Sequence, residues 1–592
     1  MTPRLARPLS DMKPRYDVVV IGSGYGGGVA ACRLARCGRS VCVLERGREI
    51  MPGEFPDRPT EATRALQVVG EKTTLGSPTA LFEVRLGEGI HVLKGCGLGG
   101  TSLINAAVCL TPDERVFDFP AWPREVTSDR LLAEGYARAR AMLRPGAQPG
   151  WQSFEKVKAF ATSASVFNKE LVAAPIHVAF TAGPNAANVD QPACTACGDC
   201  CGGCNVGAKT TVANTYLADA AAHGAEIFTE ASVGSIGKLL DGTWNVRFKP
   251  TGKDGSEGLE RTINAAIVVL AGGTLGSTEL LLRSQGQGLA VSKTLGERVT
   301  SNGDVISLAY NNVCAVNGVG VGHPAKVELA PVGAAVNSLL DLRRDGSVRE
   351  GLALVECALP SSLAPLLPVM LASGSAVFGQ DESHSLAEEL AELDRATKSL
   401  LLGAYKGAIH NTQTFLAVGH DDGDGRMVLK NDRLVVEWPN AVRQTVFQRI
   451  ETALKKATAA TGGTYLPNPA SEQLLGGNLM TVHPLGGCIM ATNAGAGVVN
   501  HKCQVFDTSP NAPAGAVHAG LYVCDGSVIP SSVGVHPLLT ITAVAERAMR
   551  HLAHDRQWDM REGPAPRLVQ ATDAPIAAPP ARKKGLFAWF RR

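Results

Sequence analysis

A glycine-rich turn near the start of the chain constrains its fold most strongly. An apolar run at 16–21 predicts a strand, and Gly22, Gly24 and Gly27 follow it in G-x-G-x-x-G spacing at the start of a small-residue helix. The three glycines allow a tight turn, the approach of a pyrophosphate and close helix–strand packing. The next predicted strand ends at Glu45, where an acid can bind a ribose 2′-hydroxyl. The sequence therefore predicts a Rossmann-type dinucleotide-binding unit.

Two later segments repeat this pattern of an apolar strand with a glycine-rich end, at 265–277 and 519–532. A chain of 592 residues is longer than one core usually serves, so we expect these segments to return to the nucleotide domain while a second domain lies between them. The glycine motif alone does not distinguish FAD from NAD. The acid at Glu45 disfavours NADP, and contributions from late segments favour FAD, because a long flavin cofactor needs contacts along its whole length.

Four stretches of sequence resemble one enzyme family. GSGYGG…LERG at the start, LKGCGLGGTSLINAA at 93–107, VHPLGGC at 482–488 and DGSVIPSSVGVHPLLTITAVAER at 525–547 are similar to the glucose–methanol–choline (GMC) flavoprotein oxidoreductases. Within the family they most resemble its bacterial cholesterol-oxidase branch. The resemblance implies FAD bound without a covalent link and the oxidation of an alcohol to a ketone or aldehyde.

The fold class expected on these grounds is α/β, with a Rossmann-type FAD-binding domain assembled from discontinuous segments and an α+β substrate domain with an antiparallel sheet. We expect the FAD-binding domain to comprise 15–125, 206–325 and 479–555, the last of which contains the catalytic histidines. The substrate domain comprises 126–205, with a cysteine-rich insert, and 326–478. Residues 556–592 are expected to form a disordered tail.

Further cofactor-binding residues are implied by the resemblance, position by position. The loop against the flavin contains Gly97, Gly99, Gly100, Thr101, Ser102 and Asn105. Val233 would contact the adenine through its backbone, and Gly272 and Gly273 would lie near the adenosine. Asp525 and Gly526 would lie near the ribityl chain and the pyrophosphate.

Two histidines are the candidate catalytic groups. Alcohol oxidation by a flavin transfers a hydride from the carbinol carbon to flavin N5, while the hydroxyl proton passes to a base that titrates near neutrality. His483 matches the family position that faces the substrate hydroxyl. His536 matches the second position, where members carry His or Asn; the cholesterol-oxidase branch typically has Asn, so this chain departs from it.

Glu356, within an apolar run, occupies a place similar to a pocket glutamate of cholesterol oxidases. If the substrate is a 3β-hydroxy-5-ene steroid, this acid could move a proton during isomerisation of the double bond. A glutamate on one face of an amphipathic strand would give the same local sequence.

A cysteine cluster carries a separate signal. Cys194, Cys197, Cys200 and Cys204 have the C-x2-C-x2-C-x3-C spacing of bacterial ferredoxins, which indicates an iron–sulfur cluster; Cys201 has no role in that pattern. Ferredoxins have Pro after the fourth cysteine and this chain has Asn205. Zinc, packed thiols and disulfides are the alternatives. A cluster here would relay electrons outward from reduced FAD.

Composition and charge limit the classes of molecule that the protein is expected to bind. A net charge of +2 without a long basic run excludes nucleic acid as the main partner. No apolar stretch approaches the roughly 20 residues of a spanning helix, and the N-terminus lacks an apolar signal segment, so we expect a cytoplasmic protein. The terminal KKGLFAWFRR allows at most peripheral contact with an anionic membrane.

The function predicted from these features is FAD-dependent oxidation of a bulky, apolar alcohol such as a 3β-hydroxysteroid. Oxygen, a quinone or a cytochrome is the electron acceptor. The alternative is a flavin/iron–sulfur electron carrier without substrate chemistry, which the two histidines disfavour because pure electron transfer needs no paired bases.

Overall fold

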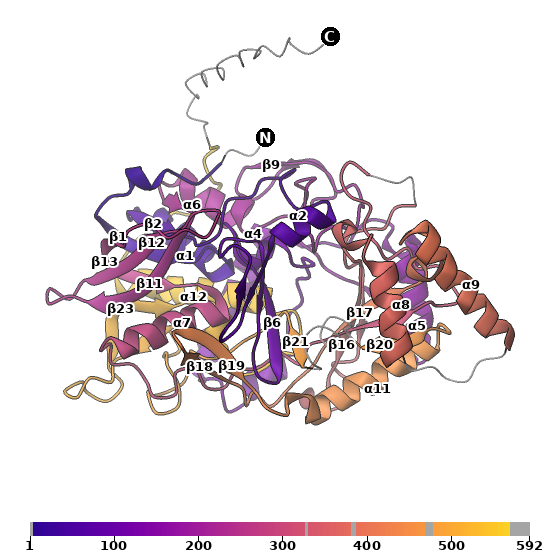
Figure 1. Cartoon of the computed structure of the whole chain (residues 1–592). Helices are drawn as coiled ribbons and strands as arrows, with labels where there is room; N and C mark the ends of the chain where they lie inside the picture. Colours follow the sequence, from indigo (N-terminus) through magenta and orange to yellow (C-terminus); the bar gives the residue numbers. More distant parts are fainter. Residues whose placement is uncertain (1–3, 326–329, 380–385, 468–477, 569–592) are drawn as a thin grey trace, which may run out of the picture.

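A computed structural model describes residues 4–325, 330–379, 386–467 and 478–568. Two large sheets organise these residues, with the first sheet at one end of the molecule and the second at the other (Figure 1). The first carries the predicted nucleotide-binding unit and the second belongs to the predicted substrate domain.

The first sheet has a parallel centre, in the order β10 (Glu226–Phe228), β2 (Val41–Leu44), β1 (Arg15–Ile21), β13 (Arg261–Leu270) and β23 (Val517–Val523). β2 is buried along its whole length, as its uninterrupted apolar sequence requires in a parallel sheet covered on both faces. The strands come from widely separated parts of the chain, which confirms the prediction of a Rossmann-type domain assembled from discontinuous segments.

β13 is shared between two neighbours. Its first half pairs antiparallel with β12 (Trp244–Pro250), and its last three residues pair in parallel with β23. β11 (Ala231–Lys238) continues the sheet beyond β12, and β22 (Gln504–Phe506) adds to β23.

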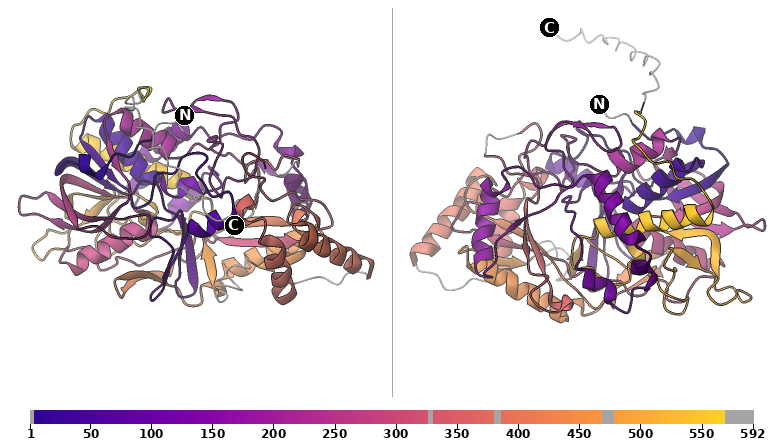
Figure 2. Two further views of the ribbon diagram at one scale, coloured as in Figure 1. Left: turned by 45° about the horizontal axis from the view of Figure 1, so that its top comes forward. Right: turned by 180° about the vertical axis from the view of Figure 1, so that it is seen from behind.

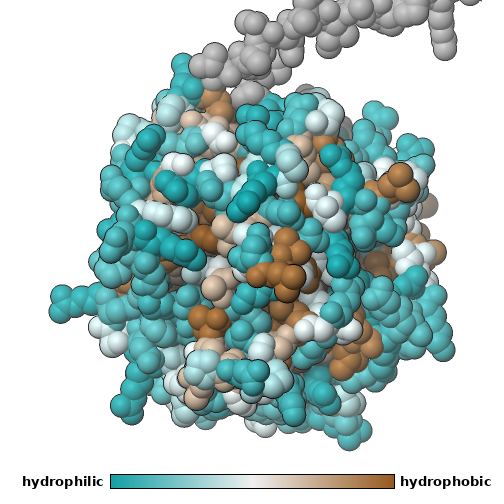
Figure 3. Space-filling model, turned by 90° about the vertical axis from the view of Figure 1, so that its left-hand side faces the viewer, coloured by the Kyte–Doolittle hydropathy of each residue, from teal (hydrophilic) through white to brown (hydrophobic). Residues whose placement is uncertain are grey.

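The face at this end of the molecule is mostly hydrophilic, with a small apolar patch near its middle (Figure 3).

Helix α1 (Tyr25–Arg36) follows the glycine turn and is buried throughout. It packs against α12 (Leu538–Asp555), and two hydrogen bonds of 2.7 Å join the guanidinium of Arg33 to the carboxylate of Glu546. α4 (Leu131–Leu143) lies along the other side of α12, as the view from behind shows (Figure 2). A helix placed by the sequence in the substrate domain (126–205) thus packs on the nucleotide domain.

The second sheet is antiparallel, in the order β20 (Thr464–Pro467), β14 (Val305–Tyr310), β17 (Gln413–Val418), β16 (Ala353–Cys357), β15 (Ser338–Asp341) and β7 (Val172–Ala173). α5 (Glu155–Ser165) and α11 (Thr445–Ala459) pack against it. β14 lies within the predicted 206–325 segment of the FAD-binding domain, yet it is an inner strand of this second sheet.

The third, smaller sheet has the order β21 (Leu479–Thr481), β6 (Ile90–Gly95), β5 (Phe82–Arg85), β3 (Leu66–Val69) and β4 (Thr74–Leu75). The remaining elements are α2 (Pro59–Arg64), α3 (Glu125–Ser128), α6 (Ala218–Ala222), α7 (Gly273–Gly286), α8 (Leu367–Phe378), α9 (Leu386–Leu402), α10 (Gly407–His410), β8 (Gly183–Pro184), β9 (Asp190–Gln191), β18 (Arg426–Lys430) and β19 (Arg433–Glu437).

None of the helices in the described part of the chain is long and apolar enough to cross a membrane. The basic and aromatic segment proposed for membrane contact lies within 569–592, outside the described residues.

Candidate active site

The glycine turn is a close-packed cradle. A Cβ on Gly22, which has φ +96°, would stand 2.3 Å from the carbonyl oxygen of Ala271, and one on Gly27 would stand 2.1 Å from that of Gly22. A Cβ on Gly24 would meet nothing within 4 Å. The turn therefore packs tightly against β13 on one side and leaves open space at Gly24, before the N-terminus of α1, where the motif places a pyrophosphate.

Glu45 connects this turn to the predicted flavin loop at 97–105. Its carboxylate accepts hydrogen bonds from Ser23 Oγ at 2.6 Å and from the backbone N–H of Gly47 at 2.7 Å. Ser23 Oγ in turn accepts from the N–H of Gly99 at 3.0 Å, and a Cβ on Gly100 would lie 2.9 Å from the Cα of Gly24. The structure thus places the predicted cofactor residues of the glycine turn next to those of the flavin loop.

The polar side chains of the flavin loop fix its conformation and attach it to β6 and α1. Thr101 Oγ1 accepts from the N–H of Gly95 at 3.1 Å, and Ser102 Oγ donates to the carbonyl of Gly99 at 2.6 Å. Asn105 Nδ2 donates to the hydroxyl of Tyr25 on α1 at 2.7 Å. Gly97, at φ +157°, precedes these residues in the loop.

Asp525 fastens the third cofactor segment to the second. Its carboxylate accepts from the N–H of Gly273 at 3.0 Å and from Ser277 Oγ at 2.5 Å on one oxygen, and from the N–H and Oγ of Ser527 at 2.9 and 2.6 Å on the other. Burial raises the pKa of this carboxyl, and its four donors oppose that rise.

The remaining predicted cofactor residues are Gly272, Gly526 and Val233. Gly272 donates its N–H to Ser277 Oγ at 3.0 Å, and a Cβ on Gly526 would stand 2.6 Å from Thr274 Oγ1. Val233 lies on β11, where the register with β12 shifts.

The two predicted catalytic histidines face each other. The rings of His483 and His536 have centroids 5.0 Å apart and an interplanar angle of 75°. His483 follows β21, and His536 stands two residues before α12, so the pair forms where the small third sheet meets the start of that helix.

Asp304, which the sequence interpretation missed, orients His483. Its Oδ1 lies 2.8 Å from His483 Nδ1, and its Oδ2 accepts from Thr481 Oγ1 at 2.8 Å and from the N–H groups of Val482 and His483 at 2.9 Å each. A carboxylate can only accept from Nδ1, so the proton of a neutral His483 stands on Nδ1 and its Nε2 keeps a lone pair.

His536 is buried, and neither ring nitrogen has a hydrogen-bond partner among the described residues. Burial lowers the pKa of His536 well below its usual value, with smaller contributions from His483 and Arg343. The ring is therefore neutral at physiological pH. A buried imidazole with two unused nitrogens marks a place where a ligand supplies the missing partner.

Asn302 positions the segment before His536. Its side-chain oxygen accepts from the N–H groups of Val533 at 2.8 Å and Gly534 at 3.2 Å, and its Nδ2 donates to the carbonyl of Val535 at 2.7 Å. One short loop, 300–304, therefore supports both histidines. Its sequence TSNGD offers only a turn signal, Asn-Gly, and nothing that relates it to residues about 180 or 230 positions later.

Glu356, the third predicted catalytic residue, is not joined to the histidine pair. Its carboxylate is fully buried on β16, 2.8 Å from Lys156 Nζ, and also accepts from the N–H of Asn337 at 2.8 Å and from the N–H and hydroxyl of Ser338 at 3.1 and 2.8 Å. No hydrogen bond connects it to either histidine within the described ranges.

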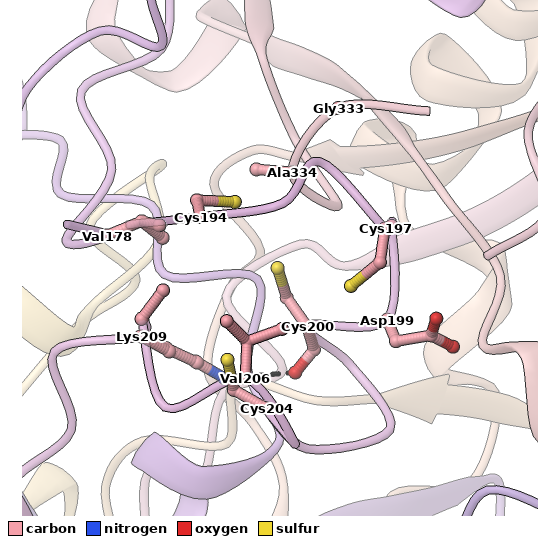
Figure 4. A pocket seen from close by; sticks show the side chains of 12 residues that line it. Val178, Cys194, Cys197, Asp199, Cys200, Cys204, Val206, Lys209, Gly333 and Ala334 are labelled. Atoms are coloured by element: carbon pink, nitrogen blue, oxygen red, sulfur yellow. Dashed lines mark hydrogen bonds between the residues drawn. The ribbon is translucent and has the colours of Figure 1, made fainter. Parts of the chain in front are cut away.

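The four predicted metal-ligating cysteines converge on one small pocket. Figure 4 shows the sulfur atoms of Cys194, Cys197, Cys200 and Cys204 facing a common space. All four are free thiols in the structure. Cys201 lies outside this ring, and its sulfur is 3.9 Å from that of Cys357 on β16.

The glycine turn, the flavin loop and the orphaned His536 fit a bound FAD. The cradle excludes side chains where the motif needs close backbone approach, and open space remains at Gly24 and Gly273, where a Cβ would meet nothing within 4 Å.

Comparison with known proteins agrees with this geometry. A family model described as GMC oxidoreductase matches residues 18–301, and a second with the same description matches 436–545. A cholesterol oxidase of Mycobacterium tuberculosis (strain ATCC 25618 / H37Rv) is 27% identical over 627 aligned residues, with 98% of each chain covered. A cholesterol oxidase of Acinetobacter baumannii is 26% identical, with 91% of this chain and 94% of that protein covered.

More distant similarities extend the comparison. The Arabidopsis thaliana long-chain-alcohol oxidase FAO3 is 23% identical over 90% of this chain and 67% of its own length. Among solved structures, pyridoxine 4-oxidase from Mesorbium loti superimposes with a TM-score of 0.56 at 17% identity, covering 91% of this chain and 99% of that one, which shows a shared fold. Because the family models cover more than half of the sequence, the chain belongs to the GMC oxidoreductase family, whose members bind FAD.

Proposed function

We propose that the protein oxidises a bulky, apolar alcohol, such as a 3β-hydroxysteroid, to a ketone or aldehyde with FAD as the hydride acceptor. The observation that carries this proposal is the histidine pair: Asp304 fixes His483, and no described residue is a hydrogen-bond partner of either nitrogen of the buried His536. The cholesterol and long-chain-alcohol oxidases among the relatives support a large apolar substrate.

The residues divide the work as follows. His483 Nε2, left with its lone pair by the Nδ1–Asp304 hydrogen bond, accepts the hydroxyl proton of the alcohol. His536 is neutral, so one of its nitrogens donates a hydrogen bond to the same oxygen and holds the carbinol carbon in place. FAD, when bound along the glycine turn and the 97–105 loop, supplies the acceptor for the hydride.

The paired bases disfavour the alternative of an electron carrier without substrate chemistry. Transfer of electrons alone requires no group that accepts a proton from a hydroxyl, and a buried histidine without partners costs stability that only a ligand recovers. For Glu356 we propose a structural role, since both of its oxygens are occupied by Lys156 and by the 337–338 backbone.

Anaerobic titration of the purified flavoprotein tests the proposal. Cholesterol, 1-hexadecanol and benzyl alcohol are added separately, and bleaching of the flavin absorbance is followed. We expect at least one of the two large apolar alcohols to bleach the flavin, and His483→Ala to lose this response while dithionite still bleaches it. Bleaching of wild type and His483→Ala at equal rates would contradict the assignment of the base. The rate of reoxidation by oxygen, compared with a quinone and a ferric cytochrome, then identifies the acceptor.

A further inference from the structure

The proposed alcohol chemistry does not use the cysteine pocket. Four sulfur atoms within one eleven-residue loop face a single space that is closed on its other side by Gly333 and Ala334. We propose that this pocket binds a [4Fe–4S] cluster, with Cys194, Cys197, Cys200 and Cys204 as its four ligands.

The spacing of the sulfur atoms disfavours a single ion. A tetrahedral zinc site holds its sulfurs about 2.3 Å from the metal and hence about 3.8 Å from one another. Within the described residues, the set of three potential ligands whose donor atoms all lie within 4.8 Å is Asp129, His501 and His551, so no three of these sulfurs are that close. A cubane cluster, with one thiolate on each iron, needs the wider separation.

A buried cation without an anion points to the same ligand. Lys209 lines the pocket and is 1% exposed. Among residues that the structure describes, its ammonium donates only to the backbone carbonyls of Leu103 at 3.2 Å, Cys200 at 3.1 Å and Asn105. No carboxylate in the described part of the chain forms an ion pair with it. A [4Fe–4S]²⁺ core with four thiolates has a net charge of about −2, which supplies the missing counter-charge.

The wall of the pocket is built to donate to sulfur. The N–H of Ala335 points to Cys200 Sγ at 3.4 Å, and that of Ala196 to Cys194 Sγ at 3.4 Å. Hydrogen bonds to the ligand sulfurs are one of the means by which proteins set the potential of a cluster.

The buried pair of Lys156 and Glu356 holds this wall. Lys156 Nζ donates to the carbonyl of Ala335 at 3.2 Å, and the carboxylate of Glu356 accepts from the N–H groups of Asn337 and Ser338. The acid predicted as a proton shuttle therefore supports the 335–338 segment, which donates to a cluster ligand.

Lys209 also connects the pocket to the flavin loop, because its ammonium bridges the carbonyl of Cys200 and those of Leu103 and Asn105. An oxidised cluster in the pocket can take one electron from two-electron-reduced FAD. No covalent bond between heavy atoms forms or breaks in this step: the cluster is reduced by one electron, the flavin is oxidised by one, and one proton passes from the flavin to solvent. This electron transfer rests on the proposed function, whereas cluster binding does not.

The test is metal and sulfide analysis of full-length protein purified without oxygen, after incubation with ferrous iron and sulfide. We expect about four iron and four acid-labile sulfide per chain in wild type and in Cys201→Ser, a control in the same loop, and loss of most of both in Cys197→Ser. Retained FAD absorbance would show that the Cys197→Ser chain is folded. Zinc without labile sulfide, or no bound metal, would overturn the proposal.

Spectroscopy on wild type and Cys201→Ser keeps the test independent of how Cys197→Ser folds. Dithionite should produce the electron paramagnetic resonance signal of a reduced cluster in both proteins, and absence of that signal would overturn the proposal. An alcohol that bleaches the flavin should produce the same signal, and bleaching without it would overturn the electron transfer. A dithionite signal in protein that no alcohol bleaches would leave the cluster in place and contradict only the alcohol chemistry.

Discussion

Asp304 Oδ1 lies 2.8 Å from Nδ1 of His483, and the other carboxylate oxygen accepts from Thr481 Oγ1 and from two backbone N–H groups. The carboxylate is thus locked in one orientation, and it dictates which nitrogen of His483 carries the proton. The proposed base His483, just after β21, thus gains a fixed tautomer from a residue on the 300–304 loop, which leads into β14 of the second sheet.

Replacing Asp304 by Asn should reverse that tautomer. The amide oxygen must stay where three donors point, so the NH₂ group faces His483 Nδ1 and drives its proton to Nε2. We expect the limiting rate of flavin reduction to fall by about 10²- to 10⁴-fold. Stopped-flow absorbance measures this rate, with Thr481→Val, which removes only one of the donors, as the control. Equal rates in Asp304→Asn and wild type would show that Asp304 does not set the tautomer.

Removing the His483 ring by substitution with Ala should slow alcohol-driven reduction by about 10²- to 10⁴-fold, because the hydroxyl proton loses its acceptor. FAD content should not change, since none of the hydrogen bonds of the glycine turn involves this side chain. Absorbance of the bound flavin gives the content, and the rate is measured as above. Loss of FAD from the variant would mean that the ring serves the cofactor site instead.

His536 should make the folded protein sensitive to acid. Its pKa is lowered in the folded state, so the unfolded chain binds a proton below pH 6.5 that the folded chain does not. Stability is therefore complete above about pH 6.5 and falls as the pH decreases below it, by up to about 1.4 kcal/mol per pH unit. Urea unfolding at pH 7.5, 6.0 and 5.0 measures this slope, which His536→Asn should reduce by that amount. An unchanged slope would show that the ring is protonated in the folded protein.

Lys156→Met should leave the carboxylate of Glu356 buried without its cation, because both side chains are fully buried. We expect a loss of about 3–5 kcal/mol in the free energy of unfolding. The double variant Lys156→Met/Glu356→Gln, which has no buried charge at this place, should recover part of the loss. Thermal and urea denaturation of the three proteins measure both effects, and additive losses in the double variant would refute the coupling.

Gly24→Ala should separate cofactor binding from folding. The added methyl group meets nothing within 4 Å in the protein, so the apoprotein should be as stable as wild type, while FAD should bind at least about tenfold more weakly because the methyl group enters the space for the pyrophosphate. Gly237→Ala on β11, also with nothing within 4 Å, is the matched control and should bind FAD normally. Fluorescence titration of the apoproteins with FAD measures the two affinities.

Local motifs predicted much of the fold and the site. The turn at Gly22–Gly27 could be predicted because the glycines that its geometry requires lie close together in the sequence. The histidine of HPLGG could be proposed as a catalytic residue from the few residues around it. The structure brings His483 and His536 together across 53 positions of sequence.

Long-range partners could not be predicted in the same way. Asp304 precedes its histidine by 179 positions and Lys156 precedes Glu356 by 200, and neither has a local signature. The short sequence around Glu356 therefore suggested a catalytic acid, although its environment is set by a lysine on α5. Likewise, β14 is a mostly apolar run whose last four residues are all buried, a pattern that fits a strand of either large sheet, and only its pairing with β17 and β20 assigns it to the second sheet.

The shared edge of β13 has a consequence for how the protein is made. The parallel centre of the first sheet is complete only when residues 517–523 pair with the end of a strand synthesised some 250 residues earlier. Until then, Arg33 on α1 also lacks Glu546, and the cofactor cradle has no Asp525 to fasten it. On the ribosome the nascent chain must therefore carry an open sheet edge while some 250 residues are added, so FAD can be captured fully only by a chain whose translation is almost finished.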